Sequence, residues 1–213
     1  MAKKQNTIIR KSQTILHELS EGDSQFEYTV EEGVKATIVL TSLKNRRARV
    51  NLVVRLAGRG SSATIIGIFL GAKSSDVRMQ TSQIHAAPAT VSNLLVKSVL
   101  HDKSQFNYGG SIRVEKDAQK TDAYQRNENL LTGIGAHATS TPSLEILAND
   151  VRCTHGSTTG PVDQAELWYL ESRGISPQNA EKLIVEGYIS AAVGLVDDLQ
   201  IRDLLWQKIR AAI

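Results

Sequence analysis

Residues 50–56 read Val50-Asn-Leu-Val-Val-Arg-Leu56, and apolar side chains recur in them at every second position. The apolar side chains at positions 50, 52, 54 and 56 would share one face of an extended chain, because successive side chains of a strand point to opposite sides. Alternation of this kind predicts a β-strand with one buried face.

Comparable runs lie on both sides of this one, between about Gln25 and Thr158. They recur roughly every 13–16 residues, and the breaks between them are short and rich in glycine, serine and charged residues. Helical periodicity is absent from this whole region. The further predicted strands are residues 34–40, 63–70, 77–84, 91–100, 106–114 and 144–153.

Two all-β architectures fit short strands at this spacing, an antiparallel sandwich and a solenoid of stacked turns. No Asn-Gly or Asp-Gly pair stands between the runs, and such pairs are the strongest local signal of tight hairpins. Their absence favours the solenoid, although no strict hexapeptide or nonapeptide repeat is present. Tyr124 and Asn127 are expected to belong to an asparagine-rich turn that closes one of its rungs.

The character of the sequence changes after Gly160-Pro161. Asp163, followed three residues later by Glu166, has the spacing of a capping box and predicts the start of a helix. Gly174 would end this helix, because glycine tolerates the left-handed conformation that follows many helices.

Two more helices are predicted after this point. Ser176-Pro177 marks the start of the second, with serine as the cap and proline at the first helical position. Apolar residues at spacings of three and four predict the third, from about Val196 to Ala212. The expected plan is an N-terminal extension over residues 1–25, a β-helix core domain over 26–160 and a C-terminal helical domain over 161–213.

The composition is that of an ordinary globular protein. The 213 residues are 41% hydrophobic and 22% charged, with a formal net charge of +3. The basic run between Ala2 and Lys11 is expected to be a solvated terminus. No run approaches the roughly 18 apolar residues that a membrane span needs, and the start lacks the apolar centre of a signal peptide. We therefore expect a cytoplasmic protein.

Several enzyme classes find no support in the sequence. It contains no Gly-x-x-x-x-Gly-Lys-Ser/Thr phosphate loop, no Gly-x-Ser-x-Gly elbow and no His-Glu-x-x-His zinc helix. A sugar-cleaving solenoid would need paired acids and exposed aromatic residues, and the β region offers few aromatics and no repeated acidic pair. The chain is therefore not expected to be an enzyme.

Cys153 is the only cysteine, and it lies in the densest group of chemically versatile side chains. In a strand, Cys153 and His155 would point to one face about 7 Å apart. Thiolate and imidazole groups both bind iron, and sulfur suits iron–sulfur clusters in particular. Stacking of turns would bring His137 near this pair. Spacing alone leaves open an ordinary buried cysteine beside a hydrogen-bonded histidine.

Trp168 and Tyr169 are two large aromatic residues on the first predicted helix. One of them is expected to pack inward. The other is a candidate anchor for a protein partner, since aromatic side chains dominate many binding interfaces.

Ordered motifs between His85 and Tyr188 resemble the core of the SufB/SufD family. The most specific of them are Gly110-Ser-Ile-Arg-Val-Glu-Lys-Asp-Ala118, Thr121-Asp-Ala-Tyr-Gln-Arg-Asn-Glu-Asn-Leu-Leu131, Asp150-Val-Arg-Cys-Thr-His-Gly-Ser-Thr158 and Leu167-Trp-Tyr-Leu-Glu-Ser-Arg-Gly-Ile175. The resemblance implies a mainly β fold, a right-handed parallel β-helix followed by a small C-terminal α-helical domain. It also implies a role as scaffold in iron–sulfur cluster assembly by the SUF system.

The resemblance carries further expectations about partners and site residues. It implies a SufC-like ABC ATPase bound to the C-terminal helices, for which Trp168, Tyr169, Arg173 and Gly174 are the candidate contacts. It implies a second SufB/SufD-type subunit, either another copy or a paralogue, with a transient iron–sulfur cluster at the interface. No nucleic acid or membrane partner is expected.

The stretch around Cys153 and His155 resembles the SufD branch, whose Cys-x-His pair lines the scaffold interface. These two residues are therefore the expected iron ligands, with His137 as a further candidate. The SufB branch places a cysteine just ahead of a Gly-Ala-His segment, and here that position is Ile134. The alternative is a protein that binds the ATPase but has lost cluster chemistry.

Overall fold

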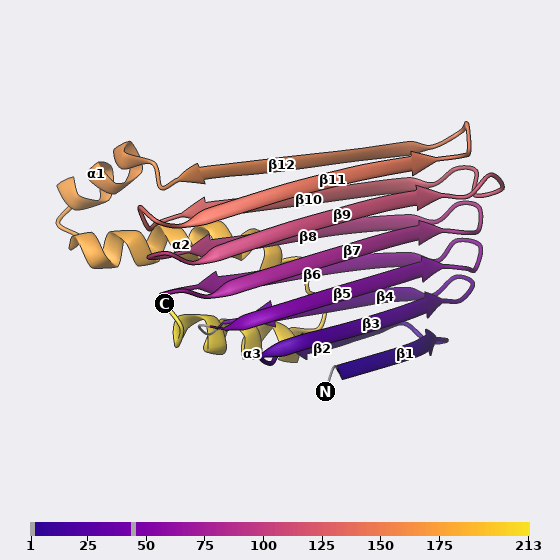
Figure 1. Ribbon diagram of the computed structural model, residues 1–213, viewed down its shortest axis with the longest axis horizontal. Helices are drawn as coiled ribbons and strands as arrows, with labels where there is room; N and C mark the ends of the chain where they lie inside the picture. The colour runs from indigo at the N-terminus through magenta and orange to yellow at the C-terminus, as the bar shows by residue number, and fades with distance from the viewer. Residues whose placement is uncertain (1–2, 44–45) are drawn as a thin grey trace.

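The computed structural model describes residues 3–43 and 46–213, and within them the chain forms twelve strands and three helices (Figure 1). One sheet consists of β1 Lys3–Ile9, β3 Gly22–Val30, β5 Arg47–Leu56, β7 Asp76–His85, β9 Gln105–Val114 and β11 His137–Ile146. The other consists of β2 Gln13–Glu18, β4 Lys35–Ser42, β6 Ser62–Gly71, β8 Val91–Leu100, β10 Asp122–Leu131 and β12 Arg152–Pro161. The helices are α1 Gln164–Ser172, α2 Pro177–Val193 and α3 Leu199–Arg210.

The strands alternate between the two sheets, and every recorded pairing is parallel. β8, for example, pairs with β6 before it and β10 after it, each one full turn away along the chain. The near sheet runs to the right and the far sheet returns to the left as the chain rises, which is a right-handed path (Figure 1). The fold is therefore a right-handed parallel β-helix, as predicted, and not a sandwich.

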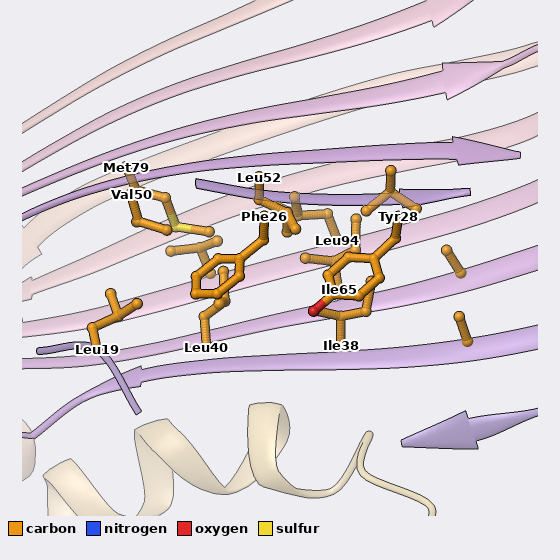
Figure 2. Packing of buried hydrophobic residues seen from close by; sticks show 14 of the residues in the cluster. Leu19, Phe26, Tyr28, Ile38, Leu40, Val50, Leu52, Ile65, Met79 and Leu94 are labelled. Carbon is orange, nitrogen blue, oxygen red and sulfur yellow. The ribbon is translucent and has the colours of Figure 1, made fainter. Parts of the chain in front are cut away.

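Inward-facing side chains from both sheets fill the interior of the solenoid. Phe26 and Tyr28 on β3 lie over Ile38 and Leu40 of the opposite sheet (Figure 2). Leu52 on β5 belongs to the same cluster and is completely buried. The apolar residues at alternate positions, which predict these strands, are thus the residues that point into this interior.

Helices α2 and α3 cover the outer face of the sheet that contains β6 and β8 (Figure 1). Val185 and Ile189 of α2 belong to one apolar cluster with Ile66, Ile68 and Val99 of the sheet. This contact explains why β6 and β8 carry apolar residues on both faces. None of the helices in the described part of the chain is long and apolar enough to cross a membrane.

Two strands begin earlier in the chain than predicted. β1 and β2 lie within residues 1–25 and pair with β3 and β4 as the first turn of the solenoid. Their apolar residues are few and are interrupted by Arg10 and Lys11, so their alternation is weak. Tertiary pairing with the next turn, rather than local pattern, forms these strands.

The predictions for the last turns were partly wrong. Tyr124 and Asn127 lie inside strand β10, not in a turn, and Asn127 points into the interior. The strand predicted over residues 144–153 is instead the end of β11, a connection, and the start of β12. Polar interior residues hide the apolar alternation here, because asparagine, glutamine and serine replace aliphatic side chains.

Gly58 allows two successive turns of the solenoid to approach each other closely. A Cβ atom at this position would lie 1.9 Å from the backbone nitrogen of Glu32 and 2.2 Å from its Cα. Backbone cannot move aside as a flexible side chain can, so Gly58→Ala is expected to destabilise the fold by about 2–3 kcal/mol. Urea unfolding followed by circular dichroism measures the change.

Gly187 provides the matched control for this substitution. It lies on the exposed face of α2, and a Cβ atom there would meet nothing within 4 Å. Alanine favours a helix interior over glycine by about 1 kcal/mol, so Gly187→Ala is expected to stabilise the protein. Equal effects of the two substitutions would contradict the close stacking of turns at Gly58.

His85 is completely buried in the interior, with Nδ1 2.8 Å from the Thr90 hydroxyl and Nε2 2.8 Å from the Ser92 hydroxyl. Burial lowers its pKa from 6.5 to about 4. Below pH 6.5 the unfolded chain therefore binds a proton that the folded chain does not, so stability is lost as the pH falls.

Between pH 7 and pH 4.5 this single group is expected to cost about 2.5 kcal/mol of unfolding free energy. Urea unfolding at both pH values measures the loss in the wild-type protein and in His85→Gln, which cannot titrate. The variant is expected to lose correspondingly less stability between the two pH values. The same loss in both proteins would show that His85 does not carry the effect.

Candidate functional site

The last turn of the solenoid has no further turn stacked on it. β11 and β12 end their sheets, so each leaves one backbone edge without a described partner strand (Figure 1). Several of their inward-facing side chains are consequently exposed, including Leu144 at 38% and Ile146 at 39%. Exposed strand edges beside apolar side chains are a ready surface for another polypeptide. We call this surface, formed by residues 137–146 and 152–161, the open end.

Cys153 and His155 both lie on β12 at the open end. In the parallel register Cys153 is opposite Ala123 and His155 opposite Gln125, both of which point into the interior. The two side chains therefore face the same way, as the alternation predicts. Cys153 is half-buried and packs beside the apolar cluster of Ile112 and Val114, while His155 is exposed.

The surroundings of Cys153 favour the protonated form of its thiol. Burial and the neighbouring Asp122 carboxylate both raise its pKa, and a backbone hydrogen bond with Ala123 opposes them. Asp122 is itself paired with Arg152 across the two strands, 2.9 Å from carboxylate oxygen to guanidinium nitrogen. Because thiolate is the form that binds metal, a metal ion would have to displace the proton.

The described residues do not complete a metal site by themselves. Among them no group of three or more histidine, cysteine, aspartate or glutamate side chains is arranged to hold a metal ion. A tetrahedral iron site in a cluster needs more ligands than Cys153 and His155 supply. Further ligands would have to come from outside the described part of the chain.

His137 does not lie near Cys153, contrary to the expectation from stacking. It begins β11, whereas Cys153 packs at the far end of the same turn, beside the last residues of β9. The length of β11, about 30 Å, separates the two positions. His137 is also opposite Gln105, so it points away from the interior.

Amide side chains line the turn beneath the open end, a feature that sequence reasoning missed. Asn129 donates a hydrogen bond to the Thr159 hydroxyl of β12 (3.0 Å) and accepts one from Ser98 of β8 (2.7 Å). Beside them, Gln83 donates to Gln125 at 3.3 Å, and both amides are buried. The bond from Asn129 to Thr159 ties β12, the strand that carries Cys153 and His155, to the turn below, and the other two bonds join β10 to β8 and to β7.

The helix α1 forms a second candidate surface. It projects beyond the end of β12, and none of its residues is buried (Figure 1). Both of its aromatic residues are exposed, Trp168 at 80% and Tyr169 at 60%. The prediction that one of them packs inward is therefore wrong, because the half-buried residues of this helix are Leu167 and Leu170 instead.

Other exposed groups adjoin the aromatic residues of α1. The Arg173 guanidinium lies 5.2 Å from the centre of the Tyr169 ring, and Gly174 ends the helix with a φ of +83°. A hollow of about 500 Å³ separates α1 from the connection after β10 and is lined by Ile134 and Leu167. Ile134 is fully exposed. Exposed apolar groups of this size are a candidate surface for a protein partner.

The sequence pattern of the family described as SUF system FeS cluster assembly, SufBD core domain, matches residues 22–188. The chain is 35% identical over 140 residues to the iron–sulfur cluster assembly protein SufD of Escherichia coli, a match that covers 66% of this chain and 33% of that protein.

Two mycobacterial proteins give similar matches. An iron–sulfur cluster assembly SufBD family protein of Mycobacterium leprae is 29% identical over 175 residues, covering 78% of this chain and 45% of that protein. The corresponding protein of Mycobacterium bovis is 30% identical over 165 residues, covering 74% of this chain and 42% of that protein. The matched part thus amounts to a third to under half of each of these relatives.

Proposed function

Because this chain belongs to the SufB/SufD family of the SUF system, we propose that it is a scaffold subunit on which iron–sulfur clusters are assembled. A nascent cluster would form at the open end, where Cys153 and His155 contribute ligands and a second SufB/SufD-type subunit contributes the others. The observation that carries this proposal is the position of both side chains on one face of an uncovered turn, with His155 exposed and Cys153 half-buried. The cluster is cargo and not a resident cofactor.

The second subunit would dock along the unpaired edges of β11 and β12. These edges offer backbone hydrogen bonds, and Leu144 and Ile146 offer apolar surface. Either a second copy of the chain or a paralogue could be this subunit. A second copy related by a two-fold axis at the open end would supply Cys153 and His155 twice. Size-exclusion chromatography with light scattering distinguishes them, and a strict monomer under all conditions would oppose self-pairing.

The second proposed partner is a SufC-like ABC ATPase that binds α1. ATP hydrolysis would belong to that partner, in keeping with a chain that has no phosphate-binding loop of its own. The exposed aromatic residues of α1, with Arg173 and Gly174 beside them, would form the contact. We place the complex in the cytoplasm.

Trp168→Ala with Tyr169→Ala is expected to weaken binding of the ATPase at least tenfold, because buried aromatic anchors contribute most of the energy of such interfaces. Leu199→Ala is the matched control, as Leu199 is an equally exposed apolar residue on a different helix, α3. Calorimetric titration of the ATPase into each variant measures the affinities. Unchanged affinity in the double variant would remove α1 as the docking surface.

An alternative proposal is an interaction protein that binds the ATPase but no longer assembles clusters. The incomplete ligand set and the raised pKa of the Cys153 thiol favour this alternative. The two proposals agree on α1 and differ only at the open end. Substitution of Cys153 therefore separates them.

A further inference from the structure

A hollow of about 470 Å³ crosses the first residues of β3, β5, β7 and β9 on the outer face of their sheet. This sheet is the one that no helix covers, and its strands begin at the left in Figure 1. The hollow and Cys153 lie at opposite ends of the strands. The hollow is at the start of the odd-numbered strands, whereas Cys153 is near the start of β12, which runs the other way in the other sheet. Its volume is within the range of small-molecule sites.

The charge of the hollow is predominantly positive. Four cationic side chains line it, Arg47, Arg49, Arg78 and Lys103, against two carboxylates, Asp23 and Asp76. Asp76 accepts from Arg78 at 3.3 Å. In the described ranges no ion pair is recorded for the other three cations, so the lining carries an excess of two positive charges.

Arg49 and Arg78 occupy directly opposed positions in the parallel register of β5 and β7. Neighbouring strands are about 4.8 Å apart, and both side chains point outward on the same face. Like charges directly opposite each other destabilise a sheet. Asp23 is opposite Arg49 on the other side and Asp76 is paired with Arg78, so two carboxylates partly offset this repulsion. An anion between the two guanidinium groups would offset it further, and guanidinium forks match the oxygen atoms of a phosphate group.

The face next to these arginines is neutral and rich in hydrogen-bonding groups. Gln80, Asn107, Thr139 and Thr141 line a second hollow of about 430 Å³, one to three strands further along the same sheet. Asn107 of β9 is directly opposite Arg78 of β7 in the parallel register, so the two hollows adjoin. Amide and hydroxyl side chains of this kind bind the hydroxyl groups of a polar ligand.

We propose that this face binds a phosphorylated, hydroxyl-rich small molecule. Its phosphate would lie between Arg49 and Arg78, and its hydroxyl groups would bind the amide and hydroxyl side chains of the neighbouring hollow. In the parallel register the positions on either side of Arg49 and Arg78 are Asp23 and Asn107, so this row forms no basic stripe along the solenoid. A long polyanion such as a nucleic acid would need such a stripe. The proposal is independent of the cluster chemistry at the open end.

Calorimetric titration with inorganic pyrophosphate tests the anion site. The wild-type chain is expected to bind it saturably with a dissociation constant below about 1 mM and to gain several degrees in melting temperature. The double substitution of Arg49→Ser and Arg78→Ser is expected to weaken binding at least tenfold. Without ligand the double variant is expected to keep the wild-type circular dichroism spectrum, because both arginine side chains are exposed.

Arg55→Ser is the matched control, because Arg55 is exposed on the same face of β5 but lies at its other end. It is expected to leave pyrophosphate binding unchanged. Ribose 5-phosphate is expected to bind more tightly than inorganic phosphate, and free ribose more weakly than either. An equal loss of binding in Arg55→Ser, or an equal effect of chloride at matched ionic strength, would overturn the proposal.

Discussion

Serine in place of Cys153 is expected to remove most of the iron and sulfide that the protein and its second subunit retain after anaerobic reconstitution. A serine hydroxyl is a poor ligand for iron in a cluster, because the site depends on the soft thiolate. Serine is almost the same size as cysteine, and position 153 is only half-buried, so the fold is expected to persist. Iron and sulfide content and the visible absorbance of the cluster measure the effect.

Thr154→Ala is the control for this substitution. Thr154 is next in sequence but faces the outer side of β12, opposite Tyr124 in the register. It is expected to retain the wild-type content of iron and sulfide. If Cys153→Ser retained the same content as well, the open end would not be the assembly site, and the alternative of an ATPase-binding protein would stand.

Glu128→Ala is expected to destabilise the protein by about 3–5 kcal/mol, the largest loss of stability expected from any change proposed for this chain. Glu128 lies under α2, where its carboxylate is 2.6 Å from the Lys97 ammonium group. Lys97 is almost completely buried, and its ammonium group also lies 4.0 Å from the centre of the Tyr188 ring. Without Glu128 this buried positive charge would have lost its closest carboxylate.

The same cluster joins the helices to the solenoid. Tyr188 belongs to α2, whereas Lys97 and Glu128 belong to β8 and β10. Burial and the Glu128 carboxylate raise the pKa of the Tyr188 hydroxyl, so tyrosine stays neutral there. Loss of Glu128 is therefore expected to loosen α2 from the sheet.

Urea unfolding measures the stability of Glu128→Ala. The combined substitution Lys97→Met and Glu128→Leu is the control, since it removes the buried Lys97 charge together with its partner. It leaves only the partly exposed Arg126, which lies 3.0 Å from Glu128, without this carboxylate, and is expected to recover most of the loss. If the combined variant were as unstable as Glu128→Ala, the loss would reflect packing and not the unpaired charge.

Much of the fold is predictable from the sequence because aliphatic alternation coincides with the interior. Residues 50–56 show this plainly, as their apolar side chains face the core and Asn51 and Arg55 face solvent. The capping residues Asp163 and Ser176 also precede α1 and α2 as predicted. Local rules suffice where burial and side-chain polarity agree.

The last turns were not predictable in this way. The interior face of β10 carries Gln125, Asn127 and Asn129, whose burial depends on hydrogen bonds to neighbouring turns. Such bonds are long-range and leave no periodic apolar signal. The prediction that His137 lies near Cys153 was wrong for a related reason. The number of residues in each turn decides which residues meet, and the sequence pattern does not show that number.

The candidate site was only partly accessible from sequence. Alternation alone predicts that Cys153 and His155 share a face, but it does not reveal that no turn covers them. The basic hollow likewise depends on the register that opposes Arg49 and Arg78, two residues 29 positions apart in the chain. Charges on different turns can be related only when the number of residues in each turn is known.

The central claim is that the open end, with Cys153, becomes a subunit interface, and alkylation of this cysteine tests it most directly. Cys153 is the only thiol, so the mass of the intact chain reports its modification without ambiguity. In the isolated chain at pH 8.5 the thiol is expected to react with maleimide. With a second SufB/SufD-type subunit bound, the rate is expected to fall at least tenfold. An unchanged rate in a complex that light scattering shows to be intact would contradict the claim.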